Sequence, residues 1–91
     1  MLSEKRIEMH LIRECKKRGW HCLKLVDVGR AGYPDRQIMQ PDGAMWLCEV
    51  KRQDGKLSKI QIHRIKQLRN LGFTVHVVYS KDDIDEVLKS C

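Results

Sequence analysis

Residues 35–51 read DRQIMQPDGAMWLCEVK, and this stretch predicts the β-hairpin around which the fold is arranged. Two strand-prone segments, 35–40 and 44–51, flank a turn of proline, aspartate and glycine at 41–43. Proline sets φ at the start of such a turn, and glycine accepts a positive φ at its end. Asp42 belongs to this turn signal, so we expect it to have no catalytic role.

A helix and a strand are predicted before the hairpin. Residues 3–18 form an amphipathic pattern that begins at the cap Ser3 and stops at Gly19. The apolar stripe of this helix consists of Ile7, Leu11, Ile12 and Cys15. Residues 21–28 alternate weakly in polarity, as a strand does, and residues 28–34 form a loop rich in small side chains.

A second helix, a strand and a third helix are predicted after the hairpin. A charged loop at 52–56 leads to a helix at 58–71 that ends at Gly72, and then to a Val-rich strand at 73–79. Ser80 begins a last helix whose inward side chains are Ile84, Val87 and Leu88. Trp20, Trp46 and Phe73 are most simply core residues. The order predicts one α/β domain over residues 1–91, a sandwich in which a small mixed sheet is flanked by helices.

Composition narrows the class of partner and the compartment. The chain has 91 residues, with 18 Lys and Arg against 12 Asp and Glu, and its formal charge of +6 favours nucleic acid. The cysteines, Cys15, Cys22, Cys48 and Cys91, lack zinc-site spacing, which is typical of reduced thiols in a cytoplasmic protein. No secretory signal and no apolar run of membrane-span length is found, so no membrane partner is expected.

Glu49 and Lys51 form the first candidate for chemistry. Residues two apart on a strand face the same side, so these charges project together while Val50 faces the opposite layer. A charge at the end of an apolar strand is costly unless it is paired or bound to a metal. A salt bridge at the end of a strand would have the same sequence. Glu49 and Lys51 are a candidate site because they lie on a predicted strand, where the two side chains share a face.

Asp35 supplies a second carboxylate. It follows Pro34, which favours an extended entry to the strand, and the hairpin brings it near Glu49, Lys51 or Arg52. Two carboxylates so close repel one another unless a cation lies between them. Magnesium prefers such oxygen ligands and keeps positions open for water and phosphate.

Two further polar residues have both a structural and a functional interpretation. Glu8 lies on the apolar stripe of the first helix, as does Glu4 one turn earlier, and Glu8 is the stronger candidate for a third acid. Gln61 completes a Ser-x-x-Gln capping box with Ser58, which needs no function. It also shares the inward stripe of its helix, where an amide could orient water or a phosphate oxygen.

Basic residues and one tyrosine surround these acids along the chain. They are Arg30, Tyr33, Arg36, Arg52, Lys56 and Lys59. A solvated rim has the same composition, so the pattern supports a phosphate-binding surface without requiring one. Tyr33 is a candidate for stacking on a base or sugar. The histidines, His10, His21, His63 and His76, have no paired spacing and are read as surface or core residues.

The ordered set of motifs resembles a known family. Residues 32–35, Gly-Tyr-Pro-Asp, followed by Glu-Val-Lys at 49–51, resemble the PD-(D/E)XK nuclease superfamily. Leu57-Ser58, Gln61, Leu68, Gly72 and the apolar strand after them resemble its VRR-NUC branch, the virus-type replication and repair nucleases. The resemblance covers nearly the whole chain and implies a restriction-endonuclease-like fold. It implies metal ligation by Glu8, Asp35 and Glu49, with Lys51 as the catalytic lysine and Gln61 as a supporting residue.

The expected function is hydrolysis of DNA phosphodiester bonds with Mg²⁺ or Mn²⁺. The backbone carbonyl of Val50 is expected to add a ligand to the metal. No small-molecule cofactor is expected. Short members of the family are similar to stand-alone phage or bacterial homodimers that cut four-way (Holliday) junctions, which implies a branched DNA substrate. One alternative is a DNA-binding subunit whose site has lapsed. Another is an RNA endonuclease of similar fold that uses acid–base residues in place of metal.

Overall fold

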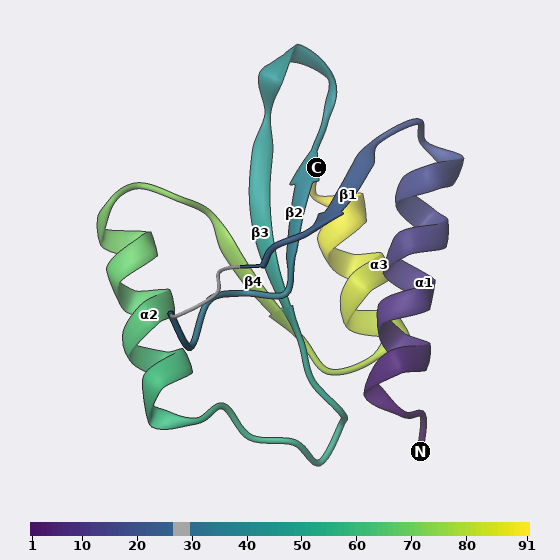
Figure 1. Ribbon diagram of the computed structural model, residues 1–91. Coiled ribbons are helices and arrows are strands. Elements are labelled where there is room, and N and C mark those ends of the chain that lie inside the picture. The colour runs from purple at the N-terminus through teal and green to yellow at the C-terminus, as the bar shows by residue number, and fades with distance from the viewer. Residues whose placement is uncertain (27–29) are drawn as a thin grey trace.

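The structure, a computed structural model, describes residues 1–26 and 30–91 (Figure 1). Its elements are α1 (Glu4–Lys17), β1 (His21–Lys24), β2 (Arg36–Met39), the 3₁₀ turn η1 (Pro41–Gly43), β3 (Met45–Val50), α2 (Lys59–Asn70), β4 (Val75–Val78) and α3 (Lys81–Lys89). The predicted order of helices and strands is confirmed. Within the described ranges, none of the helices is long and apolar enough to cross a membrane.

The predicted hairpin lies inside a four-stranded sheet with the order β1-β2-β3-β4. β2 pairs antiparallel with both β1 and β3, and Arg36 lies opposite Cys48 in the hairpin. β4 pairs parallel with β3, which places Val78 beside Val50. A parallel pair needs a long crossover connection, and α2 supplies it. The sheet is therefore mixed, as predicted, and its hairpin end reaches beyond the helices (Figure 1).

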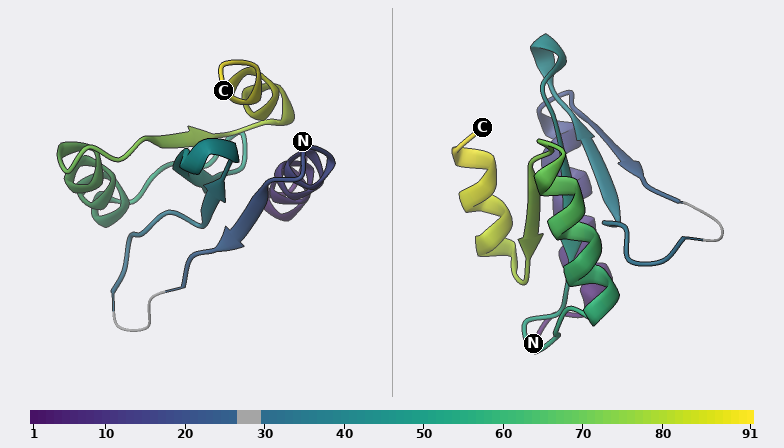
Figure 2. Two further views of the ribbon diagram at one scale, coloured as in Figure 1. Left: turned by 90° about the horizontal axis from the view of Figure 1, so that it is seen from above. Right: turned by 90° about the vertical axis from the view of Figure 1, so that its left-hand side faces the viewer.

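Helices cover both faces of this sheet (Figure 2). α1 and α3 lie on one face, where Trp46, Cys48 and Val50 of β3 join their apolar residues in one core. α2 lies on the other face, where Leu47 joins a second, smaller core. Because side chains alternate along a strand, Glu49 projects toward α2 together with Leu47.

Local sequence signals determine where the helices and the hairpin turn begin. Each of α1, α2 and α3 starts after a serine whose side chain accepts a hydrogen bond from a backbone N–H in the first turn, namely Ser3, Ser58 and Ser80. Each such cap stabilises its helix by about 1 kcal/mol. In the hairpin turn, Gly43 adopts the predicted positive φ, at 77°, and Asp42 also has a positive φ of 62°, which the sequence did not predict.

The strands are shorter than predicted at both sides of the sheet. The strand predicted at 21–28 ends at Lys24, and residues 27–29 lie outside the described residues. The strand predicted at 73–79 reduces to β4, and the predicted core position of Phe73 is wrong, since that residue is 42% exposed. The Phe73 N–H donates to the Leu68 carbonyl at 3.1 Å, so this residue closes the end of α2 before the sheet begins. Trp46 is buried and Trp20 packs against the larger core, as predicted.

Candidate active site

Glu49 is a buried carboxylate next to the end of β3, with 2% of its surface exposed. Burial and the neighbouring Asp35 carboxyl together raise the pKa of Glu49 to about 8, with burial the larger cause, and the charge of Lys51 opposes the rise. In the part of the chain that the structure describes, the Oε2 atom has no hydrogen-bond partner. A buried carboxylate oxygen without a partner is costly. A bound cation would neutralise the charge of this carboxylate, so the position favours a cationic ligand.

Asp35 is held beside Glu49 by the hairpin. It immediately precedes β2, and its Oδ2 atom accepts a hydrogen bond from the Val50 N–H at 3.0 Å, across the strand pair. Its own carbonyl accepts from the Leu25 N–H at 2.8 Å, which ties it to the end of β1. The two carboxylates predicted to converge are thus brought together, and two backbone contacts fix where Asp35 lies.

Gln61 makes both of the contacts that the sequence left open. Its Oε1 atom accepts from the Ser58 N–H at 2.8 Å, and its own N–H donates to the Ser58 hydroxyl, which completes the capping box. Its Nε2 atom donates to Glu49 Oε1 at 3.4 Å. The first turn of α2 therefore positions an amide against the buried carboxylate, and the helix cap holds that amide in place.

Lys51 follows β3 and continues its alternation. Its N–H donates to the Val78 carbonyl at 2.9 Å, so the backbone at this position is still paired with β4. The residue is half-buried, and its charge acts on Glu49. Strand alternation continued by one residue puts Lys51 on the same side of the sheet as Glu49, and its charge effect on Glu49 agrees with that side.

Glu8 is engaged by an arginine of the hairpin. Arg36 Nε donates to Glu8 Oε2 at 2.9 Å, and the same guanidinium reaches the Cys22 carbonyl at 3.4 Å. The Arg36 side chain is only 15% exposed, so it lies inside the protein and not on the predicted phosphate-binding surface. Glu4, which is exposed, is the acid of α1 whose charge raises the pKa of Glu49. The sequence could not predict the Glu8–Arg36 pair because 28 residues separate its members.

The loop before Asp35 is anchored to α2 by close packing. Gly32 has a φ of 85°, and a Cβ at this position would lie 2.7 Å from the Ile60 carbonyl oxygen. The guanidinium of Arg64 lies over the Tyr33 ring at 4.7 Å from its centroid, and its Nε atom donates to the Ala31 carbonyl at 3.3 Å. Sequence reasoning missed Arg64, although it lies one turn after Gln61 on the same helix. These contacts join the segment that carries Asp35 to the helix that carries Gln61.

Comparisons with known proteins agree with this geometry. No family model matches the chain. A solved structure described as "VRR_NUC domain" is similar to it with a TM-score of 0.89 and 27% identity over 97% of each chain. The "Putative nuclease p44" of Acyrthosiphon pisum secondary endosymbiont phage 1 is 35% identical over 82 residues, which are 90% of this chain and 88% of that protein. The chain belongs to the VRR-NUC family of nucleases.

The family implies a divalent metal, and the donor set of this VRR-NUC chain fits one in part. Asp35 and Glu49 offer two adjacent carboxylates, and the orphaned Oε2 of the second is buried. Residues 1–26 and 30–91 contain no group of three His, Cys, Asp or Glu side chains arranged to hold a metal. Mg²⁺ is commonly bound by one or two carboxylates with water completing its shell, so two are sufficient. A role for Glu8 as third ligand stays a prediction.

The packing of Gly32 in this VRR-NUC fold gives a stability prediction. Gly32→Ala is expected to lower the free energy of unfolding by about 3 kcal/mol, since it adds both a strained φ and a clash with the α2 backbone. Gly19→Ala is the matched control, because Gly19 also has a positive φ of 73° but nothing lies within 4 Å of its Cβ position. It is expected to lose only about 1 kcal/mol. Urea unfolding measures both; equal losses would contradict the packing argument.

The basic residues predicted to surround the VRR-NUC site differ in their exposure and in their contacts. Lys56 and Lys59 are exposed, and Arg52 is 57% exposed while it pairs with Asp54 at 3.2 Å. Arg30 lies 3.4 Å from the Tyr33 hydroxyl, which places it on the loop before Asp35. The predicted basic residues Arg30, Arg52, Lys56 and Lys59 are therefore exposed, whereas the Arg36 side chain is mostly buried.

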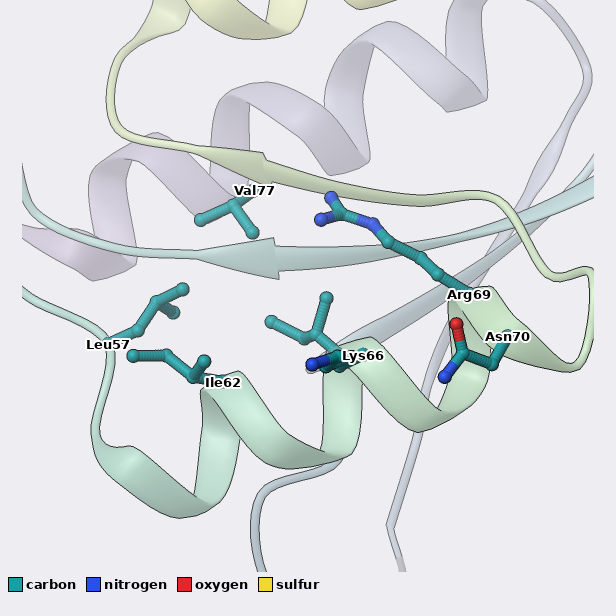
Figure 3. A pocket seen from close by; sticks show the side chains of 7 residues that line it. Leu57, Ile62, Lys66, Arg69, Asn70 and Val77 are labelled. Atoms are coloured by element: carbon teal, nitrogen blue, oxygen red, sulfur yellow. The ribbon is translucent and has the colours of Figure 1, made fainter.

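A cavity of about 370 Å³ lies on the α2 face of the VRR-NUC sheet, and its described lining residues include neither Asp35 nor Glu49 (Figure 3). It lies between α2 and β4, with Leu57, Ile62 and Val77 as apolar walls and Lys66 and Arg69 beside them. Val77 is the strand neighbour of Glu49, so the cavity adjoins the site. None of its described lining residues is an acid, so Asp35 and Glu49 remain the candidate residues for chemistry on this face.

Proposed function

We propose that this VRR-NUC nuclease hydrolyses phosphodiester bonds of DNA as an endonuclease that depends on Mg²⁺ or Mn²⁺. The observation that carries the proposal is the buried Glu49 carboxylate, whose unpartnered oxygen lies beside the second carboxylate of Asp35. Two such groups next to a lysine and an amide match the demands of phosphoryl chemistry, in which negative charge must be held and neutralised.

Each residue of the site has a separate task in this proposal. Asp35 and Glu49 hold the cation, the Val50 carbonyl adds a ligand, and Gln61 orients Glu49 through its 3.4 Å contact. A bound divalent cation polarises a phosphate oxygen and lowers the pKa of an attacking water. Lys51 neutralises the negative charge that develops on the phosphate in the transition state. The exposed Lys56 and Lys59 bind the phosphate backbone of the substrate.

Glu8 is proposed as the third acid because it lies on the buried side of α1, where 26% of its side chain is exposed. Its recruitment requires the ion pair with Arg36 to open. Glu8→Gln is therefore expected to weaken Mn²⁺ binding about tenfold, and Glu4→Gln to leave it within twofold. Calorimetric titration of Mn²⁺ into both variants measures the two affinities. Equal affinities in the two variants would leave Glu8 as the partner of Arg36 alone.

The proposed reaction is tested by cleavage of linear duplex, flap, splayed and four-way DNA, and of RNA, with Mg²⁺ and with EDTA. Cleavage of DNA that stops in EDTA is the expected result. Cleavage of RNA that continues in EDTA would favour acid–base chemistry, and binding of DNA without cleavage under every condition would indicate a lapsed site. The three functions are thus separated by one set of assays.

We expect a homodimer that prefers branched DNA. Large apolar side chains are exposed, including Leu71 at 75%, Ile62 at 54% and Phe73 at 42%, and a second copy would cover part of such a surface. Two-fold symmetry is the commonest way to supply the paired sites that symmetric junction cleavage needs. Light scattering at micromolar concentration measures the mass, and competition between junction and linear duplex measures the preference. A monomer that cuts both equally would contradict the expectation.

A further inference from the structure

Three cations surround a hollow between α1 and α3. Arg6, Met9 and Arg13 of α1 and Lys81 of α3 line a space of about 310 Å³. The three residues of α1 recur at helical spacing, so they share one face of that helix. Lys81 is the first residue of α3, which contacts α1 directly. The hollow is therefore formed by two packed helices and not by a single loop.

No ion pair among the described residues neutralises these charges. Within the ranges 1–26 and 30–91, none of Arg6, Arg13 and Lys81 makes an ion pair, and no carboxylate lines the hollow. Of the acids in the first two turns of α3, Asp85 contacts His10 at 2.8 Å and Asp83 accepts from the Tyr79 N–H at 2.8 Å, while Asp82, next to Lys81, is exposed and does not line the hollow. Three like charges around one space repel each other, and an anion in that space would remove the repulsion.

The hollow lies at the same end of the molecule as the active site. Val50 of β3 is level with Val78 of β4, and α3 begins only three residues later, at Lys81. The start of α1 is also close to this end, because the charge of Glu4 acts on Glu49. Figure 1 shows the N-terminal ends of α1 and α3 beside the end of β3. The carboxylates face α2, however, whereas the hollow belongs to the α1–α3 side.

We propose that this hollow binds a backbone phosphate of the nucleic-acid substrate, at a contact separate from the cleaved phosphate. The inference rests on the proposed function, since it assumes a nucleic-acid substrate at Asp35 and Glu49. Arginine guanidinium groups bind phosphate oxygens in pairs of hydrogen bonds, and a lysine adds a point charge. The substrate would then be held at one end of the sheet by cations from both of its helical layers.

The test measures binding without cleavage. In an Asp35→Asn background, a four-way junction and a linear duplex are titrated over a range of salt concentrations. Replacement of both Arg6 and Arg13 by alanine is expected to weaken the affinity about tenfold or more and to reduce the salt slope by about 1 per lost contact. Arg13→Glu serves as a second variant with a larger expected loss. Lys16→Ala, on the last turn of the same helix, is the matched control and should change neither quantity.

Active protein carrying the alanine pair should show a KM that rises more than kcat falls. Affinity and salt slope equal to those of the Lys16 control would overturn the proposal while leaving the proposed function intact. Failure of Asp35→Asn itself to bind either DNA would overturn both. Thermal unfolding of each variant confirms that the exposed substitutions leave the fold unchanged.

Discussion

Asp35→Asn and Glu49→Gln are each expected to slow cleavage by about a thousandfold or more, while affinity for DNA stays near that of the unchanged protein. A metal ion stabilises the transition state by several kcal/mol, and about 4 kcal/mol corresponds to a thousandfold in rate. Each amide keeps the size of its acid but loses the charge that would hold the cation. Affinity comes mainly from basic residues, which neither substitution touches.

Single-turnover cleavage with Mg²⁺ and a binding titration with Ca²⁺ measure the two quantities separately. Asp42→Asn is the matched control, because Asp42 also follows a proline but lies in the hairpin turn with a φ of 62°. Asparagine tolerates that conformation, so the control should cleave normally. Near-normal cleavage by either site variant would remove Asp35 or Glu49 from the reaction.

Lys51→Ala is expected to lower the cleavage rate by about a hundredfold or more without weakening metal binding. Lys51 shares a strand face with Glu49, and its charge acts on that carboxylate. A protonated lysine cannot bind a cation, however, so its contribution falls on the phosphate. The account thus predicts that rate and metal affinity respond differently to this substitution.

Mn²⁺ calorimetry and single-turnover kinetics on the same preparation make that comparison. Lys56→Ala, which removes an exposed lysine of the following loop, controls for the general loss of positive charge. It should weaken DNA binding slightly and leave the rate at saturating DNA unchanged. Loss of metal binding together with activity in Lys51→Ala would show that the lysine maintains the structure of the site.

Local patterns were sufficient to predict the fold. The Pro-Asp-Gly turn predicted the hairpin, and the spacing of Ile65 and Leu68 predicted the face of α2 that is buried. Serine caps and Gly72 predicted the limits of that helix to within two residues. Strand ends were predicted less well, because Phe73 is β-prone in sequence but donates its N–H to the Leu68 carbonyl at the end of α2. Tertiary hydrogen bonds decide that boundary, and no short window of sequence contains them.

The centre of the candidate site was predicted for a physical reason. Strand alternation and hairpin pairing are themselves short-range, so the meeting of Asp35 with Glu49 follows from the sequence between them. The contacts of Arg36 with Glu8 and of Arg64 with Tyr33 join separate elements and left no periodic signal. The hollow of Arg6, Arg13 and Lys81 depends on how α3 returns against α1. Such contacts depend on how the helices pack against the sheet, so they could not be predicted from the sequence alone.

The central claim is that Asp35 and Glu49 together hold a divalent cation. Calorimetric titration of Mn²⁺ into the DNA-free protein tests it most directly, with Asp35→Asn, Glu49→Gln and the Asp42→Asn control measured alongside. The account predicts binding to the unchanged protein and to the control, and loss of binding in both site variants. Binding of Mn²⁺ that is equally strong in all four proteins would contradict it.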